Sequence, residues 1–129
     1  MNDSRWHQLV SAIEGEDIEA MVNACEYLQN ECDPSDVPRL LELLRHENFV
    51  VREAAASPLA IVGGASCLCE LFSAFQMGID EGLDNDGLEN SLIGLVELHP
   101  TDSWSKLMEI KNSSDPQFHE YADWLLEFC

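Results

Sequence analysis

Few residues in this sequence have the types and spacing that metal or covalent chemistry needs. The two thiols closest in sequence are Cys67 and Cys69. On a helix, residues two apart point about 200° from one another, so these thiolates cannot easily bind one metal ion. The sequence also holds four histidines: His7, His46, His99 and His119. None has a second histidine four residues away, as a helical zinc site would. We therefore expect ordinary core or surface thiols and no metal site.

The acidic segment from Asp80 to Glu89 has some features of a calcium-binding loop, because it is rich in carboxylates. Counted from Asp80, the first, third, fifth and twelfth positions of such a loop are Asp80, Gly82, Asp84 and Ser91. Gly82 replaces a ligand and Ser91 replaces the bidentate glutamate, which argues against a high-affinity EF-hand. Weak binding of a divalent cation by the carboxylates alone stays open as an alternative.

The motifs of the common enzyme classes are also missing. The chain has no P-loop, no Gly-x-Ser-x-Gly nucleophile elbow and no dinucleotide-binding fingerprint. No nucleophile and general base stand at a recognisable spacing. We therefore expect a protein that is not an enzyme and that uses no cofactor.

The charge of the chain restricts the partners that it can bind. Its 129 residues include 25 Asp and Glu against 6 Lys and Arg, which gives a formal net charge of −19. Binding to phosphate groups needs clustered Lys and Arg, so we expect neither nucleic acid nor an anionic membrane as partner. The negative charge serves either solubility alone or an acidic surface that attracts a basic protein.

The composition predicts one folded domain over residues 1–129, because 46% of the residues are apolar. No apolar run approaches the roughly 20 residues that cross a bilayer. The first residues, from Met1 to Trp6, lack the basic and apolar regions of a signal peptide, so a cytoplasmic location is expected. The five cysteines form an odd set without a Cys-x-x-Cys pair, and we expect all of them to be reduced.

The acidic residues are unevenly distributed along the chain. Eight of them lie between Arg5 and Arg39 and nine between Arg52 and Lys106, with no Lys or Arg in either stretch. These stretches are either a solvated outer face or a surface complementary to a cationic protein. On the second interpretation, the predicted partner-binding acids are Glu14, Glu16, Asp17, Glu19, Asp80, Glu81, Asp84, Asp86 and Glu89. The candidate aromatic anchors are Trp104 and Tyr121, with Trp6 and Trp124 as further candidates.

The apolar residues recur at spacings of three and four almost throughout, which predicts an all-α protein. Gly and Pro mark the expected breaks between helices, and Pro58 is expected to kink one helix. The predicted helices are 4–14, 16–29, 37–45, 49–62, 65–77, 87–98, 103–111 and 116–128. The three glycines of the acidic segment 78–87 predict a loop there.

One stretch of the chain, residues 38–63, carries a recognisable repeat motif. Its characteristic positions are Pro38, Leu40, Leu41, Leu43, Leu44, Asn48, Val51, Arg52, Ala55, Leu59 and Gly63. This stretch resembles the HEAT repeat. A degenerate second copy lies 67 residues further on, at Leu107, Met108, Ile110, Asp115, Phe118, Ala122 and Leu126. The resemblance implies a short α-solenoid of about four stacked HEAT-like hairpins, with Leu41, Leu44, Val51, Ala55 and Leu59 facing the hairpin interface.

Small acidic chains of this architecture resemble the HEAT-like immunity proteins of bacterial toxin systems. That resemblance implies an inhibitor, monomeric when free, that binds a cognate basic toxin domain such as a nuclease. The alternative is a HEAT-like scaffold or chaperone-type accessory factor for another cellular protein, as in the HEAT proteins related to phycobilin lyases. A toxin-like reading frame beside the gene would favour the first hypothesis.

Overall fold

The computed structural model describes residues 1–129 and contains only helices, so the all-α prediction is confirmed. The α-helices are α1 (Asp3–Glu14), α2 (Ile18–Glu31), α3 (Val37–Leu44), α4 (Phe49–Val62), α5 (Leu68–Asp80), α6 (Asp86–Leu98), α7 (Pro100–Lys111) and α8 (His119–Leu126). Two short 3₁₀ helices, η1 (Pro34–Asp36) and η2 (Gly64–Cys67), precede α3 and α5. None of the helices has the length and apolar character needed to cross a membrane.

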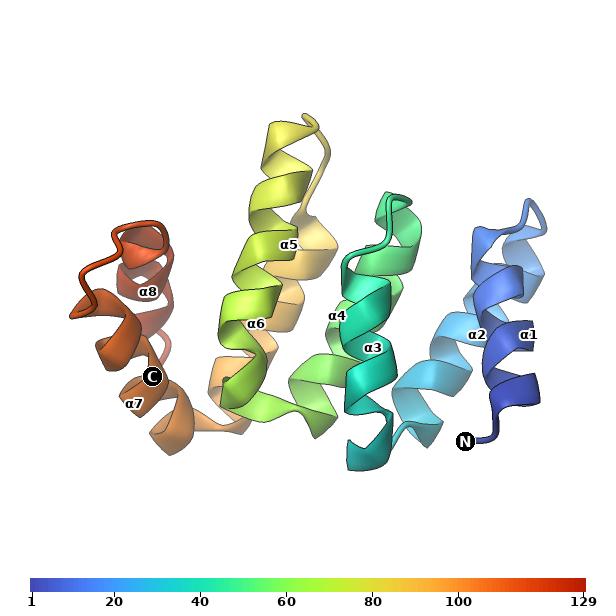
Figure 1. Ribbon diagram of the computed structural model, residues 1–129, viewed down its shortest axis with the longest axis horizontal. Coiled ribbons are helices and arrows are strands. Elements are labelled where there is room, and N and C mark those ends of the chain that lie inside the picture. Colours follow the sequence, from blue (N-terminus) through green and yellow to red (C-terminus); the bar gives the residue numbers. More distant parts are fainter.

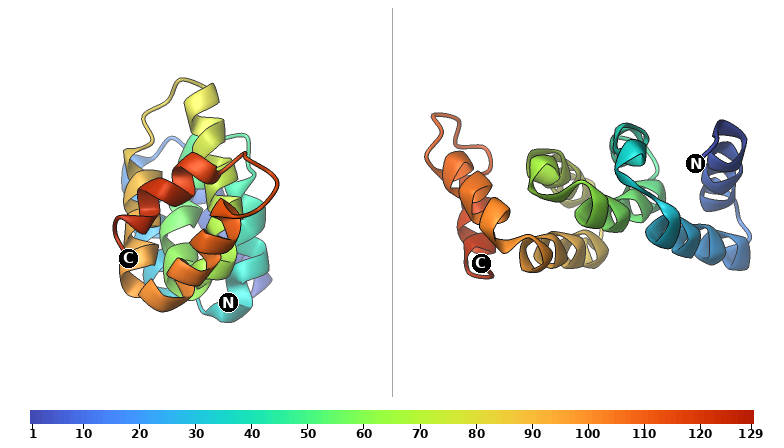
Figure 2. Two further views of the ribbon diagram at one scale, coloured as in Figure 1. Left: turned by 90° about the vertical axis from the view of Figure 1, so that its left-hand side faces the viewer. Right: turned by 90° about the horizontal axis from the view of Figure 1, so that it is seen from below.

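The helices lie in a row that follows the chain, with the two termini at opposite ends (Figure 1). Each helix packs on its chain neighbour within the pairs α1 and α2, α3 and α4, α5 and α6, and α7 and α8. Helix α4 also contacts α2 on one side and α6 on the other, and α3 contacts α5. Seen from below, α1, α3 and α5 lie along one side of the row and α2, α4 and α6 along the other (Figure 2, right). We call α2, α4, α6 and α8 the even helices and the others the odd helices.

The core is continuous along the row, because the apolar stripe of each helix faces its neighbours. Side chains with no exposed surface include Leu28, Leu40, Leu59, Leu68, Leu71, Phe72, Leu88, Leu92, Leu95 and Leu107. Of the five residues expected at the interface within the repeat, Leu44, Val51, Ala55 and Leu59 are buried and Leu41 is half-buried. Helix α4 continues through Pro58, which is itself buried.

The acidic segment is shorter and more helical than its glycines predicted. Helix α5 continues through Gly78 to Asp80, and α6 already includes Gly87, so only residues 81–85 form the connection. A Cβ at Gly78 would overlap with the side chain of Asn85, whose Nδ2 donates to the Phe75 carbonyl over 2.7 Å. The predicted break at Gly78 is therefore wrong, because this glycine permits a close approach of the connection to α5. Gly82, with φ of 72°, makes the turn.

Two helix starts near the C-terminus also differ from the prediction. Helix α7 begins at Pro100, in the first helical position that proline tolerates, and not at Ser103. Helix α8 begins at His119 and not at Pro116. Asp115 accepts from the Gln117 N–H over 3.0 Å and forms a turn before the helix.

Candidate functional site

The two predicted acidic segments lie at the same edge of the molecule. The turns that join α1 to α2, α3 to α4, α5 to α6 and α7 to α8 are all at the upper edge in Figure 1. Glu16 lies in the first of these turns and Asp84 in the third, and both are exposed. The α3 and α4 pair separates the two turns. The fold therefore puts both segments on one edge without bringing them into one cluster.

Several of the predicted partner-binding acids interact within the protein. Glu81 accepts a hydrogen bond over 2.9 Å from the guanidinium of Arg52, a side chain with no exposed surface. Asp80 accepts from Gln76 over 2.8 Å, and Gln76 in turn accepts from the Tyr121 hydroxyl. Burial, together with Asp80 and Glu120, raises the pKa of Tyr121. Asp80, Glu81 and Tyr121, which were predicted to contact a partner, therefore hold α5 and the connection 81–85 in place within the protein.

The other predicted acids lie at helix ends or are exposed to solvent. Glu14 contacts the His46 ring over 2.9 Å, and Asp17 caps α2 by accepting from the Ala20 N–H over 3.2 Å. Asp84 accepts from the Asp86 N–H over 2.9 Å within the connection. The remaining four acids make no hydrogen bond or ion pair through their side chains: Glu16, Glu19, Asp86 and Glu89. Asp86, like Glu16 and Glu19, is exposed, whereas Glu89 is half-buried.

The aromatic candidates differ in exposure. Trp104 is 53% exposed and is available to a partner. Tyr121 is half-buried and packs on Phe72, at 5.5 Å between ring centroids. Trp6 is buried at 7% exposure, with the Arg39 guanidinium 5.5 Å from its ring centroid. Trp124 is half-buried.

The even helices carry no exposed Lys or Arg. Their one basic residue is Arg52, which is fully buried. Their acids are Glu19, Glu26, Glu31, Glu53, Asp86, Glu89, Glu97, Glu120 and Asp123. The other five basic residues, Arg5, Arg39, Arg45, Lys106 and Lys111, lie on the odd helices or at their ends. Exposed basic residues are therefore confined to the odd helices and their ends, which also carry acids, and Lys111 on α7 forms an ion pair with Asp123 on α8 over 3.0 Å.

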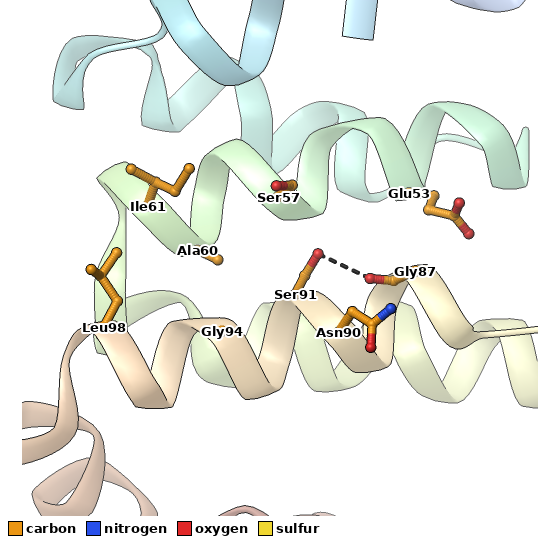
Figure 3. A pocket seen from close by; sticks show the side chains of 9 residues that line it. All are labelled: Glu53, Ser57, Ala60, Ile61, Gly87, Asn90, Ser91, Gly94 and Leu98. Carbon is orange, nitrogen blue, oxygen red and sulfur yellow. Dashed lines mark hydrogen bonds between the residues drawn. The ribbon is translucent and has the colours of Figure 1, made fainter. Parts of the chain in front are cut away.

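A groove of about 370 Å³ lies between the even helices α4 and α6 (Figure 3). The residues that line it are Glu53, Ser57, Ala60 and Ile61 on α4 and Gly87, Asn90, Ser91, Gly94 and Leu98 on α6. Small residues form its middle, Glu53 stands at one end, and Ile61 and Leu98 stand at the other. We call this hollow the α4–α6 groove.

Glu53 is the charged group of the α4–α6 groove. It makes no hydrogen bond or ion pair within the protein, and it is half-buried. Burial raises the pKa of its carboxyl group above the ordinary 4.5, and the nearby Asp84 and Asp86 raise it further. The same carboxylate contributes, after burial, to the raised pKa of the Cys25 thiol on α2. Negative charge is therefore concentrated at this end of the groove without a compensating cation.

Two glycines of α6 shape the groove in different ways. A Cβ at Gly87 would overlap with the carboxyl end of Glu53, so this glycine leaves room for the Glu53 side chain. A Cβ at Gly94 would meet no atom within 4 Å. The backbone and the core therefore do not require glycine at position 94, and any larger side chain there would project into open space in the groove.

Glu53, Ile61, Gly94 and Leu98 are not among the residues that the sequence predicted for a site. The available signal was the spacing of four residues between Glu53, Ser57 and Ile61 in α4. That pattern lines one helical face, but it does not show which other helix lies beside it.

No three or more His, Cys, Asp or Glu side chains are grouped so that they could hold a metal ion. The cysteines are all free, and burial raises the pKa of each thiol, to about 11 for Cys32. Comparisons of the chain with family models, curated proteins and solved structures gave no match.

Proposed function

We propose that this chain is an acidic inhibitor that binds a basic protein, and that it acts in the cytoplasm as an immunity protein against a bacterial toxin domain such as a nuclease. The single observation that carries the proposal is the absence of any exposed Lys or Arg on the even helices, where nine acidic residues lie. Such a surface attracts a cationic partner and repels anionic ones.

The step from acidic binding protein to immunity protein rests on the resemblance of residues 38–63 to the HEAT repeat. The proposal includes a short solenoid of four HEAT-like hairpins as the architecture. It is supported by the contacts between consecutive helices and by the burial of Leu44, Val51, Ala55 and Leu59. Arg52, at the characteristic arginine position of the motif, donates to the His46 and Glu47 carbonyls over 2.9 and 3.0 Å.

The proposed contact surface covers the even helices and the edge where the predicted acidic segments lie. Glu19, Asp86 and Glu89 lie both on the even helices and at this edge. Asp84 lies next to Asp86 in the connection between α5 and α6. Trp104, on the odd helix α7, lies outside this surface and is proposed as a separate aromatic contact, because more than half of its surface is free. Asp80, Glu81 and Tyr121 are proposed as contacts only through the atoms that their internal hydrogen bonds leave free.

The test compares two double variants with the same change in net charge. One reverses exposed acids on even helices, Glu26→Lys and Glu97→Lys. The control reverses exposed acids on odd helices, Glu42→Lys and Asp102→Lys. None of the four carboxylates has an ion-pair partner in the protein, so neither double variant breaks an ion pair.

Each variant is co-expressed in a bacterial host with the product of the gene adjacent to its own, and survival is scored. The even-helix variant should lose protection while the control retains it. Association of the two purified proteins should slow by about tenfold or more in the even-helix variant, and added salt should reproduce that loss. A neighbouring product that is harmless alone would refute immunity and favour the accessory-factor hypothesis. Equal protection by both variants would refute binding through the even helices.

A further inference from the structure

The α4–α6 groove has the features of a binding site for an extended peptide segment. Its floor is made of small residues, its two ends differ in chemistry, and it opens on the acidic side of the molecule. We propose that the groove binds an extended segment of the basic partner, with a lysine or arginine side chain at Glu53 and an apolar side chain between Ile61 and Leu98. This inference rests on the proposed function and specifies where and how the partner binds.

Gly94 indicates that the groove is kept open. Glycine in the interior of a helix is less stable than alanine by about 1 kcal/mol, so it is expected where packing demands it. No packing demand exists here, because a Cβ at position 94 would meet no atom within 4 Å. The cost in helix stability is offset if the space over Gly94 accommodates a bound chain.

Charge complementarity selects the occupant of the Glu53 end. The Glu53 carboxylate has no partner in the protein, and Asp84 and Asp86 are close enough to raise its pKa. A bound guanidinium or ammonium group would pair with the Glu53 carboxylate and stabilise its ionised form. An acidic or neutral side chain at this place would gain no such interaction.

The opposite end suits an apolar side chain. Ile61 is 42% exposed and Leu98 is 55% exposed, and both line the groove. An apolar side chain placed between them would remove exposed apolar surface on both from water, which favours binding by about 25 cal/mol for each Å².

The separation of the two ends sets the spacing in the bound segment. Glu53 and Ile61 are eight residues apart on α4, a rise of about 12 Å along the helix axis. An extended chain advances about 3.3 Å per residue, so about four residues cover this distance. Residues four apart point to the same side of an extended chain. The expected motif is therefore a basic residue and a large apolar residue separated by three others.

A second copy of the chain is the competing occupant. Each copy carries a net charge of −19, so two acidic faces would repel one another at low salt. This repulsion favours a cationic partner over a dimer formed through the groove.

The groove can be tested alone with a synthetic peptide, acetyl-Gly-Arg-Gly-Gly-Gly-Leu-Gly-amide, titrated into ¹⁵N-labelled protein by NMR. We expect saturable shifts of the amides of Gly87, Ser91 and Gly94. The matched peptide with glutamate in place of arginine should produce none. Glu53→Gln should weaken binding of the arginine peptide by about three- to tenfold, the range expected for a partly desolvated ion pair. The control Glu42→Gln, on an odd helix, should leave binding unchanged.

Gly94→Leu is the second variant, because a Cβ at position 94 meets no atom within 4 Å and the rest of the leucine side chain would project into the groove. It should abolish the shifts caused by the arginine peptide while the melting temperature stays the same or rises. Binding of the peptide to Gly94→Leu at wild-type strength would overturn the proposal, as would equal binding of the arginine and glutamate peptides. A wild-type dimer in sedimentation velocity that Gly94→Leu converts to monomer would show that the occupant is a second copy and would overturn it as well.

The same variants separate this inference from the proposed function. If Glu26→Lys with Glu97→Lys loses the protein partner while Gly94→Leu and Glu53→Gln retain it at full strength, the groove inference fails and the proposed function stands. If no basic protein binds the wild type but the arginine peptide binds in the groove as described, the proposed function fails and the preference of the groove for a basic segment stands.

Discussion

Replacing Arg52 by methionine tests how the α3–α4 turn and the α5–α6 connection are held. The guanidinium is fully buried and donates to the His46 carbonyl, the Glu47 carbonyl and the Glu81 carboxylate over 2.9, 3.0 and 2.9 Å. It also lies 5.6 Å from the centroid of the Phe49 ring. Methionine keeps most of the apolar stem of the side chain and removes every donor.

The expected loss in free energy of unfolding is about 3 kcal/mol. Each carbonyl that loses a charged donor costs about 1–3 kcal/mol, and the lower value applies because His46 and Glu47 can reach water in part. The ion pair with Glu81 adds about 1 kcal/mol or less, because the Glu81 side chain is 40% exposed. For a chain of this size, about 3 kcal/mol lowers the melting temperature by roughly 10 °C.

Urea unfolding followed by circular dichroism measures this loss, with Arg45→Met as the control. Arg45 lies at the same turn, is exposed and has no ion-pair partner, so its replacement should change stability by less than about 0.5 kcal/mol. A double-mutant cycle with Glu81→Gln isolates the ion pair and should give a coupling of about 1 kcal/mol or less. If Arg52→Met is as stable as Arg45→Met, the structural role assigned to this arginine is wrong.

Three further predictions concern packing, protonation and thiol chemistry. Leu44→Ala should lower the free energy of unfolding, measured in urea, by about 2–5 kcal/mol, because the Leu44 side chain is only 2% exposed. Because the pKa of Glu53 is raised above 4.5, the folded state binds its proton more tightly than the unfolded chain, and this group adds stability as the pH falls through the folded-state pKa toward 4.5. Glu53→Gln should therefore reduce the gain in stability measured between pH 7 and about pH 5. With a thiol reagent, the exposed Cys129 should react in the native protein, whereas the buried Cys67 should react only after unfolding.

The sequence by itself determined the helical class and most of the buried positions. Apolar residues at spacings of three and four define one face of each helix, and that face must be covered in any helical arrangement. Leu44 and Leu59 are buried for this reason. The end of α4 before Gly63 was also predictable, because glycine there ends the apolar period.

Only the tertiary structure decided which helical faces meet and what each glycine does. Gly78 looks like a loop residue in the sequence and Gly87 like the start of a helix, yet at both positions a neighbouring side chain fills the space of the missing Cβ. The approach of Asn85 and Glu53 to these glycines comes from other turns and helices, which local periodicity does not encode. The α4–α6 groove and the absence of exposed Lys or Arg on the even helices have the same origin, because both depend on which helices lie side by side. The position of a residue in a helix fixes the direction of its side chain around the helix axis. Long-range packing fixes which surface that side chain meets.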